Sequence, residues 1–266
     1  MPKGKLLATC LGLLSVLTIS APHAEADSDA ELVQKTQNPV ANLTSVPFQN
    51  NWDFGIGSTD ATRYTLNIQP VIPVSLTKDE NLIIRTIVPV IYEQATVSGS
   101  DSHSGLGDTT QSFFYSPVQP LDGWIVGAGP VFLYPTGANA FSAKKWGAGP
   151  TAVALKQEHG WTYGILANHI WSFAGSGGRK DVSSTFLQPF VGYSTKTYTT
   201  LTVNTESTYD WVESQWTVPI NLMVAQLVKI GVLPVSLQAG YRYYADAPPG
   251  GPDWGLRFTV TLLFPK

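Results

Sequence analysis

The sequence predicts an all-β protein: a transmembrane antiparallel up-and-down β-barrel of about 12 strands with a short N-terminal helix. Three observations support this prediction. Segments of about ten residues alternate apolar and polar side chains, the N-terminus resembles an export signal, and charged residues make up only 13% of the chain. A typical soluble domain contains about 25% charged residues. Tilted strands of about ten residues are long enough to cross a bilayer.

The first 26 residues have the three regions of a secretory signal. Two lysines precede an apolar run from Leu6 to Ile19, and Ala-Glu-Ala at 24–26 matches the small-residue cleavage pattern. We expect cleavage after Ala26, with Ala24 as the alternative site and a retained N-terminal anchor as the alternative interpretation. The remaining chain has no cysteine, 14 basic residues and 18 acidic residues. Disulfide chemistry is therefore excluded, and no basic patch indicates a nucleic-acid partner.

Residues 27–44 form the predicted N-terminal helical segment, and residues 45–266 form the predicted barrel. A short helix is expected over Asp29–Gln37, with acidic residues in its first turn and an end before Pro39. Two interpretations remain open. The segment is either a frayed periplasmic leader or a plug that folds into the mouth of the barrel.

The stretch Val46–Val74 predicts the first hairpin of the barrel. Even positions of its first arm are apolar apart from Asn50, odd positions are mostly polar, and a Ser-Thr-Asp break at 58–60 separates it from a second arm. Side chains alternate faces along a strand, so each arm has one apolar and one polar face. This is the alternation of a strand between lipid and a polar lumen.

Ten further segments continue the pattern, at about 81–94, 108–116, 124–134, 145–156, 161–173, 184–195, 198–209, 215–224, 234–244 and 254–264. Twelve strands is an even number, as bacterial barrels require. The alternation is weak in 108–116 and 145–156, so ten strands is the alternative. The polar stretch Ser98–Gly107 is expected to be a loop, and short turns are expected to be periplasmic and long loops extracellular.

Prolines within the predicted strands conflict with this pattern, because proline cannot donate to a β-ladder and a closed barrel has no free edge. We expect each of them to mark a bulge or the end of a strand. The positions are Pro70, Pro89, Pro130, Pro150, Pro189 and Pro219.

The polar faces carry charged residues that should point into the lumen: Asp53, Arg63, Arg85, Glu93, Asp108, Glu206, Arg242 and Arg257. In one interpretation they form a salt-bridge network that stiffens a narrow barrel. In the other they line a constriction that selects permeants by charge and size. The first and last strands are neighbours, so Asp53 is expected to meet Arg257. Arg85 and Arg242 are the first candidates for the constriction.

Aromatic residues near the segment ends are typical of the girdles at membrane interfaces. Tyr198 and Tyr244 fall on polar faces and are candidates for contact with an aromatic permeant. His169 falls on an apolar face, where some barrel enzymes place a Ser/His pair that attacks lipids. No Gly-x-Ser-x-Gly motif and no evident orienting acid accompany it. We therefore predict no enzymatic activity, no metal site and no cofactor.

Several stretches resemble the outer-membrane family linked to the MetA pathway of phenol degradation. They are QNPVANL at 37–43, VPFQNN at 46–51, NIQPVIP at 67–73, RTIVPVI at 85–91, GLGD at 105–108, and GAGP at 127–130 and 147–150. The resemblance spans most of the chain after the leader. The chain departs from barrels in general at its end, because it ends Phe264-Pro-Lys rather than on an aromatic residue.

The resemblance implies a barrel that moves small, aromatic or hydrophobic molecules. We therefore expect a channel or transporter in the Gram-negative outer membrane, with outer-membrane lipid and a small-molecule permeant as its partners. The alternatives are a barrel enzyme that acts on lipid and a closed structural barrel. The permeant and the oligomeric state stay open.

Overall fold

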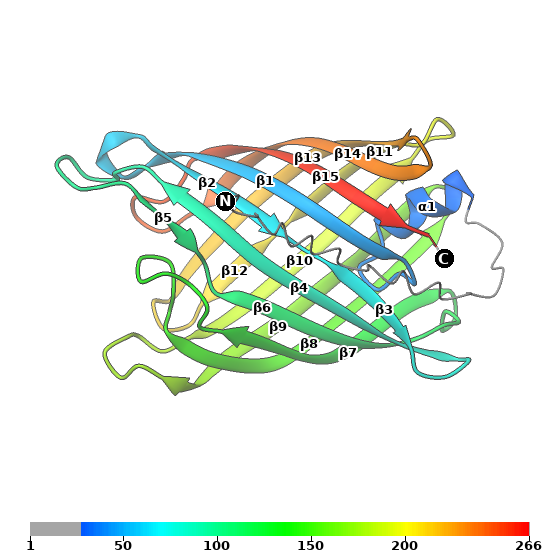
Figure 1. Ribbon diagram of the computed structural model, residues 1–266, viewed down its shortest axis with the longest axis horizontal. Helices are drawn as coiled ribbons and strands as arrows, with labels where there is room; N and C mark the ends of the chain where they lie inside the picture. Colours follow the sequence, from blue (N-terminus) through cyan, green and yellow to red (C-terminus); the bar gives the residue numbers. More distant parts are fainter. Residues whose placement is uncertain (1–27, 266) are drawn as a thin grey trace, which may run out of the picture.

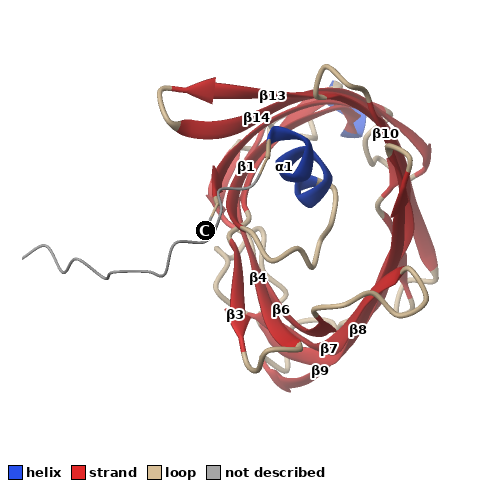
Figure 2. Ribbon diagram, turned by 90° about the vertical axis from the view of Figure 1, so that its right-hand side faces the viewer, coloured by secondary structure: helices blue, strands red, loops and turns tan. Residues whose placement is uncertain are grey.

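The computed structural model describes residues 28–265, and their strands form one closed antiparallel β-barrel (Figures 1 and 2). The strand segments are β1 Thr44–Ile56, β2 Ala61–Ile68, β3 Val71–Ser75, β4 Glu80–Glu93, β5 His103–Leu106, β6 Thr109–Pro117, β7 Trp124–Tyr134, β8 Lys145–Glu158, β9 Trp161–Gly175, β10 Ser183–Ser194, β11 Thr199–Thr205, β12 Ser207–Asp210, β13 Gln215–Ile230, β14 Leu233–Asp246 and β15 Trp254–Phe264. A 3₁₀ turn, η1 Gly57–Thr59, joins β1 to β2.

The barrel has twelve crossing strands, as the twelve-segment prediction states. Three of them are divided in two, into β2 and β3, β5 and β6, and β11 and β12. Each crossing strand pairs with its neighbour in sequence, and β15 returns to pair with β1 from Thr44↔Phe264 to Phe54↔Trp254. The alternative of ten strands is therefore wrong. The weak segments 108–116 and 145–156 correspond to β6 and β8.

The two faces of the sheet differ as the alternation predicts. On β15, Leu256 and Phe258 are 45% and 41% exposed on the outer face, while the intervening Arg257 is only 5% exposed. On β1, Asn51 and Asp53 are likewise buried. At these positions the apolar side chains face outward and the polar ones inward, which is the reverse of a soluble protein, although the inner face also carries buried apolar clusters. Over residues 28–265, no helix is long and apolar enough to span a membrane.

One expected loop is partly strand. Ser98–Gly107 was expected to be a loop, but His103–Leu106 forms β5, which pairs with Val90–Glu93 at the end of β4. The prediction is wrong at these four positions because only Leu106 is apolar, so the stretch is too short and too polar to show an apolar alternation. Pairing with the end of β4 satisfies their backbone regardless of side chain.

The prolines are accommodated by irregularities that often lie in the neighbouring strand. Pro70 separates β2 from β3, and Pro219 follows a register shift in the β13–β14 ladder. Pro89 and Pro189 lie inside continuous strands, so for them the expected bulge or strand end is wrong. Pro89 lies opposite the break between β5 and β6, and Pro189 lies opposite the break between β11 and β12. A neighbour that is itself interrupted needs no donor from the proline.

Pro130 and Pro150 face each other across the β7–β8 ladder. The pairing of β7 with β6 skips Pro130, and that of β8 with β9 skips Pro150. The glycine before each proline approaches the neighbouring strand closely. A Cβ atom would lie 2.0 Å from the Phe113 carbonyl oxygen at Gly129, and 1.7 Å from the His169 carbonyl oxygen at Gly149. The repeated Gly-Ala-Gly-Pro motif therefore combines a missing donor with a missing side chain.

Replacing Gly149 by alanine should destabilise the barrel. The new methyl group would overlap the His169 carbonyl oxygen, a backbone atom that cannot rotate away, so we expect a loss of about 1–3 kcal/mol. Guanidinium unfolding of the protein in detergent micelles measures this loss. The control is Gly177→Ala, because a Cβ atom there meets nothing within 4 Å. Equal stability of the two variants would contradict this explanation of the motif.

Candidate functional site: the barrel lumen

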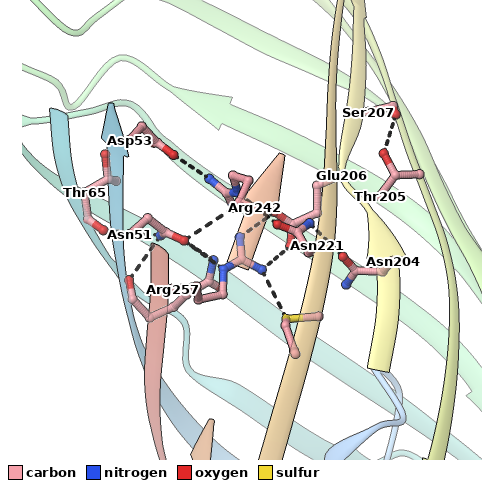
Figure 3. Close-up of polar contacts among 12 residues, drawn as sticks. Asn51, Asp53, Thr65, Asn204, Thr205, Glu206, Ser207, Asn221, Arg242 and Arg257 are labelled. Carbon is pink, nitrogen blue, oxygen red and sulfur yellow. Dashed lines mark hydrogen bonds and ion pairs between the residues drawn. The ribbon is translucent and has the colours of Figure 1, made fainter. Parts of the chain in front are cut away.

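Four charged side chains meet on the inner wall of the barrel (Figure 3). Asp53 comes from β1, Glu206 from the break between β11 and β12, Arg242 from β14 and Arg257 from β15. All four alternate with outward-facing residues, which is why the strand period aims them at the lumen. We call these four residues the lumen quartet.

Glu206 binds both arginines of the quartet. Arg257 Nη1 and Nη2 donate to Glu206 Oε1 and Oε2 at 2.8 and 2.7 Å, which is the bidentate geometry of strong guanidinium–carboxylate pairs. Arg242 Nη2 donates to Glu206 Oε2 at 3.1 Å, and its Nη1 donates to Asp53 Oδ1 at 3.2 Å. The quartet contains two positive and two negative charges and is therefore neutral.

Two asparagines and one tyrosine complete the hydrogen bonding of the quartet. Asn51 Oδ1 accepts from Arg257 Nε at 2.8 Å, and Asn221 Oδ1 accepts from Arg242 Nε at 2.9 Å. The Tyr244 hydroxyl donates to Asp53 Oδ1 at 2.9 Å. Charge alone does not single out either asparagine in the sequence. The same alternation that places Asp53 and Arg242 inward also places Asn51 and Asn221 inward, so the signal was present.

The expected contact between Asp53 and Arg257 is not made. Across the β1–β15 ladder, Arg257 lies opposite Asn51, and Asp53 lies opposite Gly255. Asp53 therefore pairs with Arg242 instead. The prediction that the first and last strands are neighbours is confirmed, but the register between them could not be read from the sequence.

The other predicted lumen charges lie outside the quartet. Arg63 and Glu93 form an ion pair across β2 and β4. Asp108 accepts the backbone N–H groups of Gly137 and Ala143 at 3.0 and 2.8 Å, so it anchors the loop between β7 and β8. Arg85 Nη2 donates to Gln69 Oε1 at 2.9 Å.

The two candidates for aromatic contact lie in different surroundings. Tyr244 lies beside the quartet, and the Arg242 guanidinium carbon is 5.8 Å from the centre of its ring. Tyr198 lies in the turn between β10 and β11, with a φ of 63°. Its carbonyl oxygen accepts the N–H of Leu227. Only Tyr244 therefore lies beside the charged wall of the lumen.

A helix lies inside one end of the barrel (Figure 2). This helix, α1 Asp29–Thr36, begins with a capping box between Ser28 and Glu31, a common signal for starting a helix. Its Leu32 and Val33 pack with Ala41 and Leu43 against the inward-facing Leu227 and Leu263 of the wall. We call residues 28–43 the N-terminal segment.

Val40 anchors the N-terminal segment to the opposite wall. It joins a buried apolar cluster with Ile83, Phe114, Val153, Leu155 and Leu166, which come from β4, β6, β8 and β9. Polar contacts between the segment and the wall also occur. Gln37 Nε2 donates to Ser194 Oγ at 2.7 Å, Gln157 Nε2 donates to the Gln34 carbonyl oxygen at 2.9 Å, and Lys229 pairs with Asp29 at 2.7 Å. Both apolar burial and hydrogen bonds therefore hold the segment in the barrel.

A cavity of about 230 Å³ lies between the N-terminal segment and the quartet, and we call it the inner chamber. Residues 35–39 together with Ala41 and Leu43 line one side of it, and Glu206 and Arg257 line another. Arg85 also faces the chamber, together with the amides of Gln49, Gln69, Gln188 and Gln238. The lumen therefore contains a space with a mixed polar and apolar wall that the N-terminal segment borders.

His169 is on the outer face of β9, as predicted, and its surroundings do not form a catalytic triad. Its Nδ1 lies 2.7 Å from the Thr185 hydroxyl, which also accepts the Trp211 indole N–H at 2.8 Å. The centre of the Trp171 ring lies 4.0 Å from that of His169. The hydroxyl partner is therefore a threonine already used by an indole, and the remaining neighbours are aromatic.

The fold and the polar lumen define the class of an outer-membrane β-barrel. The structure is similar to an outer-membrane channel from Pseudomonas putida F1, with a TM-score of 0.65, 16% identity, and coverage of 84% of this chain and 94% of that chain. It is also similar to the NanC porin, with a TM-score of 0.51, 10% identity, and coverage of 82% and 98%. At these identities the likeness shows the fold alone.

The family model described as "Putative MetA-pathway of phenol degradation" matches residues 38–229, well over half of the chain. The chain belongs to this family, as the resemblance predicted. The matched region begins in the N-terminal segment and ends in β13, so it includes most of the wall of the inner chamber. No curated protein sequence matches the chain.

Removing the Glu206 charge should cost far more than removing a surface charge. Glu206→Gln leaves two buried guanidinium groups without their shared carboxylate, and breaking a buried pair typically costs about 3–5 kcal/mol. The control is Glu213→Gln, which removes the exposed partner of Lys180 and should cost about 1 kcal/mol or less. The two stability losses are compared by measuring the denaturant midpoint of unfolding of both variants in micelles. Similar losses would show that the quartet adds no more stability than a surface pair.

Proposed function

We propose that this protein is a channel that lets small molecules cross the Gram-negative outer membrane through its lumen. The observation that carries this proposal is the inner chamber, a space lined partly by polar and charged groups inside a barrel with an apolar outer face. A structural barrel with a fully packed interior would leave no such space. The signal peptide predicted at 1–26 lies outside the described residues, and cleavage after Ala26 belongs to this proposal.

The N-terminal segment is proposed to be a plug. It lies inside the end of the barrel that also holds the short β8–β9 and β10–β11 turns, which is the periplasmic end if short turns are periplasmic (Figure 1). Two apolar clusters hold it, and its ion pair between Lys229 and Asp29 is partly exposed, with side chains 55% and 30% accessible. Exposed pairs contribute little to stability, so release of the segment loses little at this pair.

The lumen quartet and Arg85 are proposed to select permeants by charge. Opposed charges on a narrow wall set electrostatic barriers for ions and polar molecules. The family description names phenol degradation, and a small aromatic or hydrophobic molecule is the permeant that we propose on that basis. The alternative of a lipid-degrading enzyme requires a serine and an acid at His169, and the Thr185 hydroxyl occupies that position instead.

Removing the plug should open the channel. We expect deletion of residues 27–43 to give larger and more frequent conductance steps in planar bilayers, because the deletion empties the mouth of the barrel. Val40→Asn should act in the same direction, since it places an amide in a buried apolar cluster. The matched control is Val232→Asn, because Val232 is 99% exposed at the tip of the β13–β14 hairpin. If none of these proteins produced conductance steps in the bilayer, the channel proposal would be refuted.

Charge selectivity should follow Arg242. Arg242→Gln leaves Asp53 without its guanidinium partner, so the reversal potential in a KCl gradient should move toward cation selectivity. The measurement is made in the deletion background if the intact protein conducts poorly. Arg179→Gln, in the loop between β9 and β10, serves as the control. If both variants keep the wild-type reversal potential, the quartet does not lie on the conduction path.

A further inference from the structure

Arg85 differs from the other arginines of the lumen. Arg63, Arg242 and Arg257 each pair with a carboxylate. Within residues 28–265, no carboxylate oxygen lies within 4.0 Å of the Arg85 nitrogens, and its hydrogen-bond partner is the neutral amide of Gln69. Its guanidinium group nevertheless faces the inner chamber rather than bulk solvent.

The nearby acid of the quartet is already neutralised. Glu206 receives three hydrogen bonds from Arg242 and Arg257, and both of its oxygens are used. The quartet therefore does not balance the positive charge of Arg85, and Lys35 of the N-terminal segment also lines the chamber. An enclosed charge without a partner is unfavourable, and an anion in the chamber would offset it.

The rest of the chamber wall is divided between polar and apolar groups. The amides of Gln69 and Gln188 face the same space as Arg85. Phe190, Val71 and Leu263 supply apolar wall. The volume of about 230 Å³ is below the range of about 300–1,000 Å³ typical of pockets for drug-sized ligands. A molecule that fits must be small, with an anionic end and an apolar body.

We propose that the inner chamber is a binding site for small monocarboxylates with an apolar body. The planar guanidinium group of Arg85 matches a carboxylate in bidentate geometry. Phe190 and Val71 contact the body of the ligand. This inference rests on the proposed channel only in that the chamber lies on the route of the permeant. The binding site itself requires no conductance.

The test is calorimetric titration of the folded, full-length protein in micelles with benzoate. Benzyl alcohol, which has a similar ring and no charge, is titrated in parallel, and empty micelles give the partition baseline. We expect saturable binding of benzoate and no saturable binding of benzyl alcohol. Inorganic phosphate, an anion without an apolar body, should bind more weakly than benzoate.

Arg85→Met removes the charge and keeps a similar length, and we expect it to weaken benzoate binding about tenfold or more, as for other charge-assisted hydrogen bonds. Arg179→Met makes the same change in an outer loop and should bind like the wild type. Arg85→Lys keeps the charge but loses the planar guanidinium group that can donate two parallel hydrogen bonds, so this variant should bind benzoate more weakly than the wild type. This variant keeps the test valid if Arg85→Met does not fold.

Equal binding of benzoate and benzyl alcohol, or wild-type affinity in both Arg85 variants, would overturn the proposal. Phosphate that binds as tightly as benzoate would also overturn it, because the site would then recognise charge alone. Bilayer recordings separate this result from the proposed function. Conductance without benzoate binding would refute the carboxylate site but support the channel. Benzoate binding without conductance would support the carboxylate site but refute the channel.

Discussion

The pairing of β1 with β15 is the constraint on which the rest of this structure depends. Inside a bilayer no water can satisfy an unpaired strand edge, so a sheet is stable there only if it closes. Eleven registered pairs from Thr44↔Phe264 to Phe54↔Trp254 close the sheet here. Closure turns the polar face of every strand into the wall of one enclosed lumen. The quartet, the inner chamber and the place of the N-terminal segment all follow from it.

Two of the breaks in the strands border the inner chamber. Gln69, which contacts Arg85, lies in the break between β2 and β3. Glu206, which joins both arginines of the quartet, lies in the break between β11 and β12. Both residues thus bring a side chain to the lumen at a point where the ladder is interrupted. Pro189 lies opposite the break between β11 and β12. Proline has no N–H group, so it needs no acceptor from the interrupted strand.

The fold was largely predictable from the sequence, because side-chain alternation directly reports the two faces of a barrel strand. It identified the twelve crossings and the inward direction of Arg242 and Arg257. Contacts between strands were harder to predict from the sequence, because they depend on the register of each strand pair. A shift of two residues keeps the faces but changes each partner, which explains why Asp53 was expected beside Arg257 and lies beside Arg242. The insertion of Val40 into an apolar cluster depends on tertiary packing, which no local pattern reports.

A channel requires a water-filled route through the lumen. The chain has no cysteine after residue 10, so a single introduced thiol can be probed with a charged, membrane-impermeant methanethiosulfonate reagent. Thr202 faces the inner chamber, and its neighbour Leu201 is 56% exposed on the outer face. In lipid vesicles, we expect the reagent to modify Thr202→Cys, faster when residues 27–43 are deleted, and to leave Leu201→Cys unmodified. A Thr202→Cys thiol that stays unreactive in both forms would contradict a water-filled route.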